Sequence, residues 1–221
     1  MADTTGAVAH TITLYSSTIS DCSARLRIGL HLKRLPYTLV DVNISRNEQL
    51  DPKYVDINEA LTVPTLVIDY KTIGLDDNEE RVVLTQSIAA LEYLDEAFPG
   101  THSILPPVSE PLARAKWGRL SNTTSHVLSS EAAKATGNRD WDTIWITRGL
   151  KVYEKLASKT AGTYSFRDQV TLADIVLLPE LWTASRVGVN LDQYPTISRI
   201  FKNLSQLDSV QSAQMDPSSE L

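Results

Sequence analysis

Residues 11–42 read TITLYSSTISDCSARLRIGLHLKRLPYTLVDV, and this stretch indicates the fold class of the N-terminal half. Thr11 to Tyr15 and Tyr37 to Val42 are short runs of β-branched and apolar residues, which is typical of strands. Between them, Cys22 to Leu35 carries apolar residues at helical spacing. A helix that joins two strands of one sheet implies parallel pairing and a right-handed connection. The stretch therefore predicts a β-α-β unit.

The residues that follow predict a mixed α/β domain that ends near residue 98. Lys71 to Glu80 is expected to form an extended hairpin loop, because Gly74 and four acidic residues make it too polar for a core element. Ser87 to Phe98 predicts a helix, since its apolar residues lie three and four apart and it begins with a serine suited to an N-cap. A short helix is expected at Glu48–Ile57, and strands are expected at Thr65–Asp69 and Arg81–Leu84.

The C-terminal half predicts an all-α domain. Residues 99–108 are rich in proline, serine and threonine, as is typical of an interdomain linker, so we expect domains at 1–98 and 109–221. Thr171 and Asp174 have a spacing typical of a capping box, so Asp174 is interpreted as a residue that fixes a helix start rather than a catalytic one. Apolar residues at helical spacing run through 111–134, 141–159, 172–187 and 196–207.

Composition and charge exclude several classes of protein. With 42% hydrophobic residues and a formal net charge of -6, the chain is expected to form a full core and not to bind nucleic acid. Residues 1–10 lack the basic start and apolar run of an export signal, and about 18 consecutive apolar residues occur nowhere, so a cytoplasmic protein without membrane contact is expected. The single cysteine, Cys22, cannot supply a cysteine metal cluster, and no metal site is expected.

Four segments carry a resemblance to a known family. Ser20 to Ile28, SDCSARLRI, resembles the Ser-Ser-Cys-x-x-Arg-x-Arg-Ile signature of zeta-class glutathione transferases, the family that includes maleylacetoacetate isomerase. Val63 to Leu66, Gln86 to Ala89 and Thr160 to Ile175 agree with that family in order and spacing. The resemblance implies the glutathione transferase fold, with a thioredoxin-like N-terminal domain that binds glutathione and an all-helical C-terminal domain that binds substrate. It also implies a homodimer.

Two of these segments suit the backbone and the γ-glutamyl carboxylate of glutathione. Val63 and Pro64 stand at a strand start and suit a cis peptide bond, which would present an open strand edge to a tripeptide. The alternative is an ordinary turn proline. Gln86 and Ser87 open a helix, and a helix N-terminus with a serine hydroxyl can bind a carboxylate. The alternative is that Ser87 is only an N-cap.

Ser20 and Cys22 lie where the first predicted strand gives way to the first helix. A thiol with an ordinary pKa of about 8.5 is mostly protonated at neutral pH, so a hydroxyl donor and a helix N-terminus aimed at the sulfur would favour the thiolate. The resemblance gives Ser20 this role, and an N-cap serine is the alternative. Cys22 either lines the site or is a small buried apolar side chain.

The resemblance implies two functional residues in the helical half. His126 would face glutathione across the domain cleft, and Arg186 would hold a substrate carboxylate, which a guanidinium suits through bidentate pairing. The alternatives are a structural histidine and a solvated surface arginine. The family commonly has Arg and Ser where this chain has Ile19 and Asp21. If both residues face the substrate, the local charge falls by about 2, which disfavours a dianion such as maleylacetoacetate.

The activity implied by the resemblance is a glutathione-dependent cis-trans isomerisation of an α,β-unsaturated carbonyl compound. The thiolate adds to the conjugated double bond, the bond rotates, and elimination returns glutathione, while Arg186 stabilises the developing negative charge. Two alternatives stay open, a transferase that conjugates glutathione to electrophiles and a binding module without chemistry. Because of Ile19 and Asp21, the expected substrate carries at most one carboxylate and a larger apolar part, as in a polyketide-derived enone.

Overall fold

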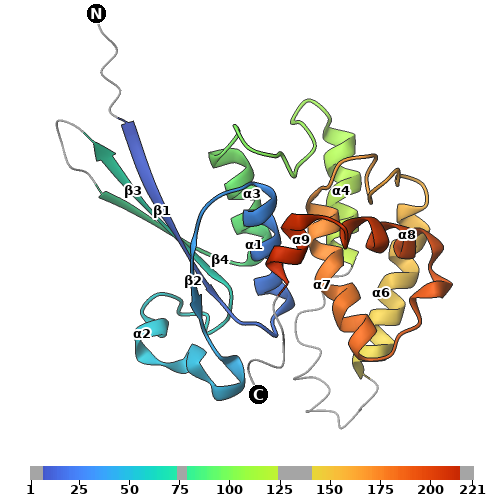
Figure 1. Ribbon diagram of the computed structural model, residues 1–221, viewed down its shortest axis with the longest axis horizontal. Coiled ribbons are helices and arrows are strands. Elements are labelled where there is room, and N and C mark those ends of the chain that lie inside the picture. The colour runs from blue at the N-terminus through green and yellow to red at the C-terminus, as the bar shows by residue number, and fades with distance from the viewer. Residues whose placement is uncertain (1–6, 74–78, 124–140, 215–221) are drawn as a thin grey trace, which may run out of the picture. The chain divides into compact units, whose positions relative to one another are not determined.

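The computed structural model describes residues 7–73, 79–123 and 141–214, which form two compact units that divide between Ala97 and Phe98 (Figure 1). The first unit contains a four-stranded sheet in the order β2-β1-β3-β4. β1 runs parallel to β2 and antiparallel to β3, and β3 runs antiparallel to β4, so the predicted β-α-β unit is confirmed. The strands are β1 (Ala7–Ser16), β2 (Thr38–Asp41), β3 (Thr65–Ile73) and β4 (Glu79–Thr85).

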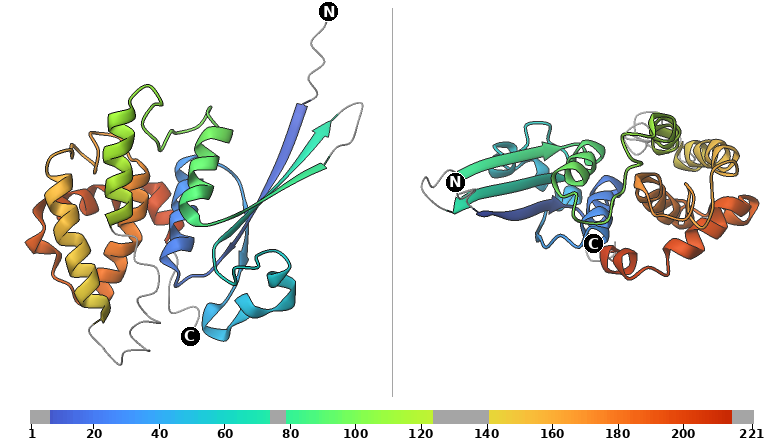
Figure 2. Two further views of the ribbon diagram at one scale, coloured as in Figure 1. Left: turned by 180° about the vertical axis from the view of Figure 1, so that it is seen from behind. Right: turned by 90° about the horizontal axis from the view of Figure 1, so that it is seen from above.

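Two helices pack together on one face of this sheet, α1 (Asp21–Leu32) and α3 (Ser87–Ala97) (Figure 2). The sheet presents fully buried residues such as Leu14 and Leu66, which lie opposite each other in the β1–β3 register. Gly29 of α1 allows a close approach to α3, because a Cβ atom there would lie 2.1 Å from Leu91 Cδ2. An ion pair also ties the two helices, with the buried Lys33 Nζ 2.9 Å from Asp95 Oδ1.

The β3–β4 hairpin is longer than the sequence predicts. The ladder continues through the pairs Tyr70–Glu80 and Lys71–Glu79, so the prediction of a loop over residues 71–80 is wrong for its ends. The side chains of Lys71, Glu79 and Glu80 are exposed, and a ladder of this kind can be polar because backbone hydrogen bonds, not burial, hold it. Polarity alone therefore did not distinguish a loop from an exposed hairpin.

The predicted helix at Glu48–Ile57 is also wrong as a single element. It consists of a 3-10 turn, η2 (Glu48–Leu50), and a short helix, α2 (Pro52–Val55), preceded by η1 (Ile44–Arg46). Pro52 stands at the first position of α2, where its missing amide hydrogen costs nothing, and Asp51 caps that helix by accepting from the Lys53 amide at 2.8 Å.

The second unit is helical, as predicted. Its elements are α4 (Pro111–Thr123), α6 (Trp141–Ala157), α7 (Leu172–Arg186), η3 (Leu191–Gln193), α8 (Pro195–Leu204) and α9 (Asp208–Ala213). The capping box is present: the buried Asp174 carboxylate accepts from the Thr171 amide and from the Ser165 amide, both at 2.8 Å. Burial raises the pKa of this carboxyl. Helix α9 was not predicted, because six residues give too short a span for helical periodicity. Among the described residues, no helix is both long and apolar enough to cross a membrane.

Candidate functional site

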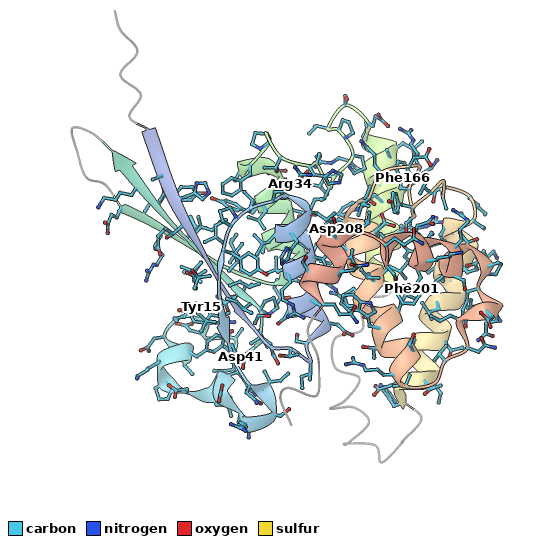
Figure 3. All side chains as sticks on the ribbon, in the orientation of Figure 1. Tyr15, Arg34, Asp41, Phe166, Phe201 and Asp208 are labelled. Atoms are coloured by element: carbon cyan, nitrogen blue, oxygen red, sulfur yellow. The ribbon has the colours of Figure 1, made fainter. Side chains whose placement is uncertain are left out.

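Strand register brings three predicted glutathione-binding segments to one end of the sheet. Tyr15 lies opposite Thr65, and Thr65 lies opposite Thr85. This end therefore holds the end of β1, the start of β3 and the end of β4, together with the segments attached to them. Figure 3 marks it by the labels of Tyr15 and Asp41, where β1 and β2 stop. The attached segments are the Ser17–Ser20 turn, the Val63–Pro64 dipeptide, and the Gln86–Ser87 entry into α3.

Ser20 is the N-cap of α1. Its hydroxyl oxygen accepts from the Ser23 backbone amide at 3.2 Å, and its own amide donates to the Ser17 carbonyl at 3.3 Å. The Ser17 amide in turn donates to the Ser23 hydroxyl at 3.1 Å. Three serines thus close a ring of hydrogen bonds between the end of β1 and the start of α1. Because the Ser23 amide uses only the oxygen of the Ser20 hydroxyl, the hydroxyl hydrogen can donate to a second group.

Arg27 lies beneath this turn with only 2% of its surface exposed. One guanidinium nitrogen donates to the Ser16 hydroxyl at 2.7 Å and to the Ser17 carbonyl at 3.1 Å. A buried cation is stable only when hydrogen bonds replace its hydration, so these contacts fix the side chain against the end of β1.

The Val63–Pro64 peptide bond is cis, as the sequence predicts. The segment around it is held by two residues of the α2 region, Tyr54 and Asn58. The Tyr54 hydroxyl donates to the Thr62 carbonyl at 2.5 Å, and the Asn58 amide group donates to the same carbonyl at 2.7 Å. Both side chains also lie within 2.9 Å of the Thr65 hydroxyl. Val63 is half-buried and stands two positions before the first residue of β3, Thr65.

Gln86 and Ser87 connect β4 to α3. Gln86 has a φ of 72°, a left-handed conformation, and its carbonyl accepts from the Ala90 amide at 3.1 Å. Gln86 therefore occupies the N-cap position and Ser87 is the first helical residue, so the prediction of Ser87 as the N-cap is wrong by one position. Left-handed backbone at a residue other than glycine is costly and is often found at ligand sites. The Ser87 side chain is buried at the start of α3, where helix amide groups have no intrahelical partner.

The remaining predicted residues of the first unit surround Ser20 in the sequence. Ile19, Asp21 and Cys22 are all half-buried. The Cys22 sulfur lies 3.8 Å from a guanidinium nitrogen of Arg25. Asp21 stands in the first turn of α1, where a carboxylate is favoured by the helix dipole. Asp21 can therefore stabilise the start of α1 whether or not it contacts a substrate.

The two predicted residues of the second unit are differently placed. Arg186 is exposed at the end of α7, where it donates to the Thr183 hydroxyl at 2.6 Å. His126 lies outside the described residues. The roles of both stay predictions.

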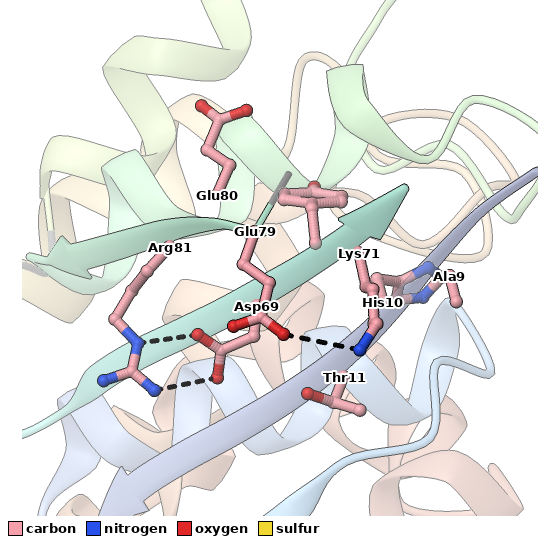
Figure 4. Close-up of a pocket in the computed structure, with 9 residues that line it drawn as sticks. Ala9, His10, Thr11, Asp69, Lys71, Glu79, Glu80 and Arg81 are labelled. Atoms are coloured by element: carbon pink, nitrogen blue, oxygen red, sulfur yellow. Dashed lines mark hydrogen bonds and ion pairs between the residues drawn. The ribbon is translucent and has the colours of Figure 1, made fainter. Parts of the chain in front are cut away.

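A hollow of about 680 Å³ lies at the other end of the sheet (Figure 4). Its charged side chains pair across strands. Arg81 binds Asp69 through two contacts of 2.6 and 3.2 Å, and Lys71 Nζ lies 3.5 Å from Glu79 Oε1. These pairs are largely exposed to solvent, and the sheet register separates them from Ser20, Val63 and Ser87. We therefore place the candidate site at the opposite end of the sheet.

Comparisons with known proteins identify the family of this chain. The family model described as the N-terminal domain of glutathione S-transferase matches residues 19–97. Maleylacetoacetate isomerase maiA of Aspergillus fumigatus is 40% identical over 212 residues, which cover 91% of this chain and 89% of that protein. The zeta-class glutathione S-transferase of Euphorbia esula is 33% identical over 213 residues, covering 92% of this chain and 89% of its own. This chain belongs to the maleylacetoacetate isomerase family of zeta-class glutathione transferases.

A solved structure extends the comparison for this zeta-class chain. Maleylacetoacetate isomerase from Anaeromyxobacter dehalogenans, with glutathione bound in its active site, aligns with a TM-score of 0.79 and 30% identity. The alignment covers 95% of this chain and 97% of that one. The glutathione transferase fold predicted from the sequence is confirmed.

Some residues of the site were not foreseen from the zeta-class resemblance. Tyr54 and Asn58 position the Val63 segment, and Arg27 supports the Ser17–Ser20 turn. Leu61, with a φ of 56°, adds a second left-handed residue next to a predicted glutathione-binding segment. The signature contains Arg27, but nothing in the sequence indicates that its charge is buried. A polar residue six or ten positions before a proline is a signal too general to single out Asn58 or Tyr54.

Proposed function

We propose that this protein is a glutathione-dependent cis-trans isomerase of an α,β-unsaturated carbonyl compound. Bound glutathione would supply a thiolate that adds reversibly to the conjugated double bond and so allows it to rotate. The observation that carries the proposal is the Ser20 hydroxyl, whose oxygen is held by the Ser23 amide. Its hydrogen is not used by that contact and can donate to a sulfur anion.

The rest of the sheet end fits a tripeptide thiol. Val63, just before β3, offers backbone groups for main-chain pairing with an extended peptide. The start of α3 at Ser87 offers amide groups and the positive end of a helix dipole to a carboxylate. In the α1 cap, Ser20 directs a hydroxyl hydrogen at the thiol. These three contacts correspond to the backbone, the γ-glutamyl carboxylate and the sulfur of glutathione, with Gln86 shaping the helix entry.

Two residues of the helical unit have proposed roles in the same reaction. Arg186 is proposed to hold a carboxylate or enolate oxygen of the substrate, since a guanidinium can pair with it through two parallel hydrogen bonds. His126 is proposed to contact glutathione. We further propose that the protein is a cytoplasmic homodimer, as the family resemblance implies. We also propose that its substrate carries at most one carboxylate and is of the polyketide-derived enone type, because Ile19 and Asp21 replace the arginine and serine common in the family.

The experiment uses catalytic amounts of glutathione. An isomerase returns its glutathione, so about a hundredth of an equivalent of glutathione should support complete conversion of a cis-enone. The conversion is monitored by the loss of the absorbance of the cis-enone and by chromatography. Consumption of one glutathione per product would instead assign the chain as a conjugating transferase. Failure to bind glutathione, measured by calorimetry, would overturn both assignments.

A further inference from the structure

The contacts of Arg27 give this side chain a role that rests on the proposed function. A single nitrogen of its guanidinium donates to the Ser17 carbonyl at 3.1 Å, and the same carbonyl accepts from the Ser20 amide at 3.3 Å. The nitrogen also donates to the Ser16 hydroxyl at 2.7 Å. One carbonyl oxygen thus links a buried cation to the backbone of the residue that is proposed to face the glutathione sulfur.

We propose that Arg27 is a positioning residue that sets the direction of the Ser20 hydroxyl by holding the Ser17 carbonyl. Ser23 binds Ser17 through its hydroxyl and Ser20 through its amide, so the ring is closed along α1. Arg27 adds a second support, because its guanidinium links the Ser17 carbonyl to the Ser16 hydroxyl at the end of β1.

Burial gives this arrangement its stiffness. Ser16, Ser17 and Ser23 are each no more than 1% exposed, as is typical of core residues, and Arg27 is 2% exposed. Water cannot readily replace a lost donor at such a place, so removal of the guanidinium takes one hydrogen bond from the Ser17 carbonyl and one from the Ser16 hydroxyl. The turn would then shift to recover hydrogen bonds, and the Ser20 hydroxyl would move with it. Since a misplacement of 1 Å can cost about a hundredfold in rate, a small shift is enough.

The first test measures the turn without glutathione. In Arg27→Met, which keeps length and removes the donors, we expect the backbone amides of residues 17–23 to exchange hydrogen at least about tenfold faster, as read by mass spectrometry. Lys33→Met is the matched control. It removes another buried cation at the end of the same helix, one that pairs with Asp95, so it destabilises the unit without touching the turn. The control should leave exchange in residues 17–23 relatively unchanged.

The second test measures the bound thiol. Glutathione thiolate absorbs in the ultraviolet, so a pH titration of the complex gives the midpoint of its ionisation. We expect a higher midpoint and about a tenfold lower kcat in Arg27→Met, with a KM for glutathione within about threefold of wild type. Arg27→Lys keeps the charge but not the fork geometry of the guanidinium. It should recover only part of the change in the midpoint and only part of the loss in kcat. In Lys33→Met the midpoint should stay where it is in wild type.

Several outcomes would overturn the inference. If Arg27→Met and Lys33→Met change stability, exchange and ionisation alike, Arg27 is merely structural. If Arg27→Lys behaves as wild type, charge alone suffices and the hydrogen-bond geometry is irrelevant. If Arg27→Met does not fold, Arg27→Gln takes its place, since it removes the guanidinium that holds the Ser17 carbonyl but keeps a polar side chain. An unchanged midpoint in that variant would also overturn the inference. A wild-type protein that binds no glutathione would overturn the proposed function. If wild type binds glutathione normally and the ionisation midpoint of the bound thiol is unchanged in Arg27→Met, only the role of Arg27 is overturned.

Discussion

Ser20 and Ser23 are joined by a hydrogen bond of 3.2 Å from the Ser23 amide to the Ser20 hydroxyl oxygen, so the proposed thiol-facing residue is also the N-cap of α1. The two roles use different parts of one hydroxyl, because the cap needs an acceptor and the thiolate needs a donor. A substitution that keeps the acceptor and removes the donor therefore separates them.

Ser20→Ala removes the cap and the donor together. We expect kcat to fall at least tenfold, about 1.4 kcal/mol in the barrier, and the free energy of unfolding to fall by about 1 kcal/mol, with glutathione binding nearly intact. Ser20→Asp keeps a cap acceptor but has no hydrogen to donate at neutral pH. It should be as stable as wild type by urea unfolding and as inactive as Ser20→Ala. Full turnover in either variant would remove Ser20 from the mechanism.

Cys22→Ala is expected to keep most of the activity, with kcat/KM within about threefold of wild type. The reason is chemical, since glutathione supplies the nucleophile and the protein thiol is not needed. The half-buried sulfur has Arg25 at 3.8 Å, so a modest loss of packing is the main expected effect. Steady-state kinetics with far-UV circular dichroism as a fold check would decide. Complete inactivity in a folded variant would make Cys22 an essential residue.

His31 predicts a pH dependence of stability. Burial, and then the positive charge of Arg27, lower the pKa of this imidazole from its ordinary value of 6.5. The unfolded chain therefore binds the proton more readily than the folded one. Stability is full above pH 6.5 and falls as the pH drops below 6.5, until the folded-state histidine is protonated too.

His31→Phe keeps a ring beside Tyr37, whose hydroxyl lies 3.2 Å from His31 Nε2, but it cannot titrate. We expect the urea midpoint of this variant to fall less than that of wild type between pH 7 and pH 5. Far-UV circular dichroism is the suitable signal, because the four tryptophans all belong to the second unit. Parallel pH profiles for the two proteins would contradict the assignment of this titration to His31.

Local patterns predicted most of the elements, and spatial relations account for what they missed. The β-α-β unit and α7 follow from apolar spacing and from the Thr171–Asp174 cap, which are properties of neighbouring residues. The prediction for the hairpin end around Lys71 was wrong because both faces of this end are solvated, so no buried face marks it as a strand. The candidate site residues Ser20, Val63 and Ser87 were identified from the family resemblance. Their meeting at one sheet end depends on the strand order β1-β3-β4, which no local pattern contains.

The last prediction concerns the charge of the substrate. Ile19 and Asp21 flank Ser20 and are half-buried, so an ion near the Ser20 hydroxyl lies in a partly shielded setting. Two charges about 4 Å apart interact by roughly 1 kcal/mol in water and roughly 4 kcal/mol near a protein surface. We therefore expect wild type to prefer the neutral ester of a maleyl compound over its dianion in kcat/KM. Ile19→Arg should raise kcat/KM for the dianion about tenfold and leave the ester nearly unchanged. Ile19→Leu is the control for shape. If wild type prefers the dianion and the arginine adds nothing, the charge argument fails and maleylacetoacetate becomes the better substrate.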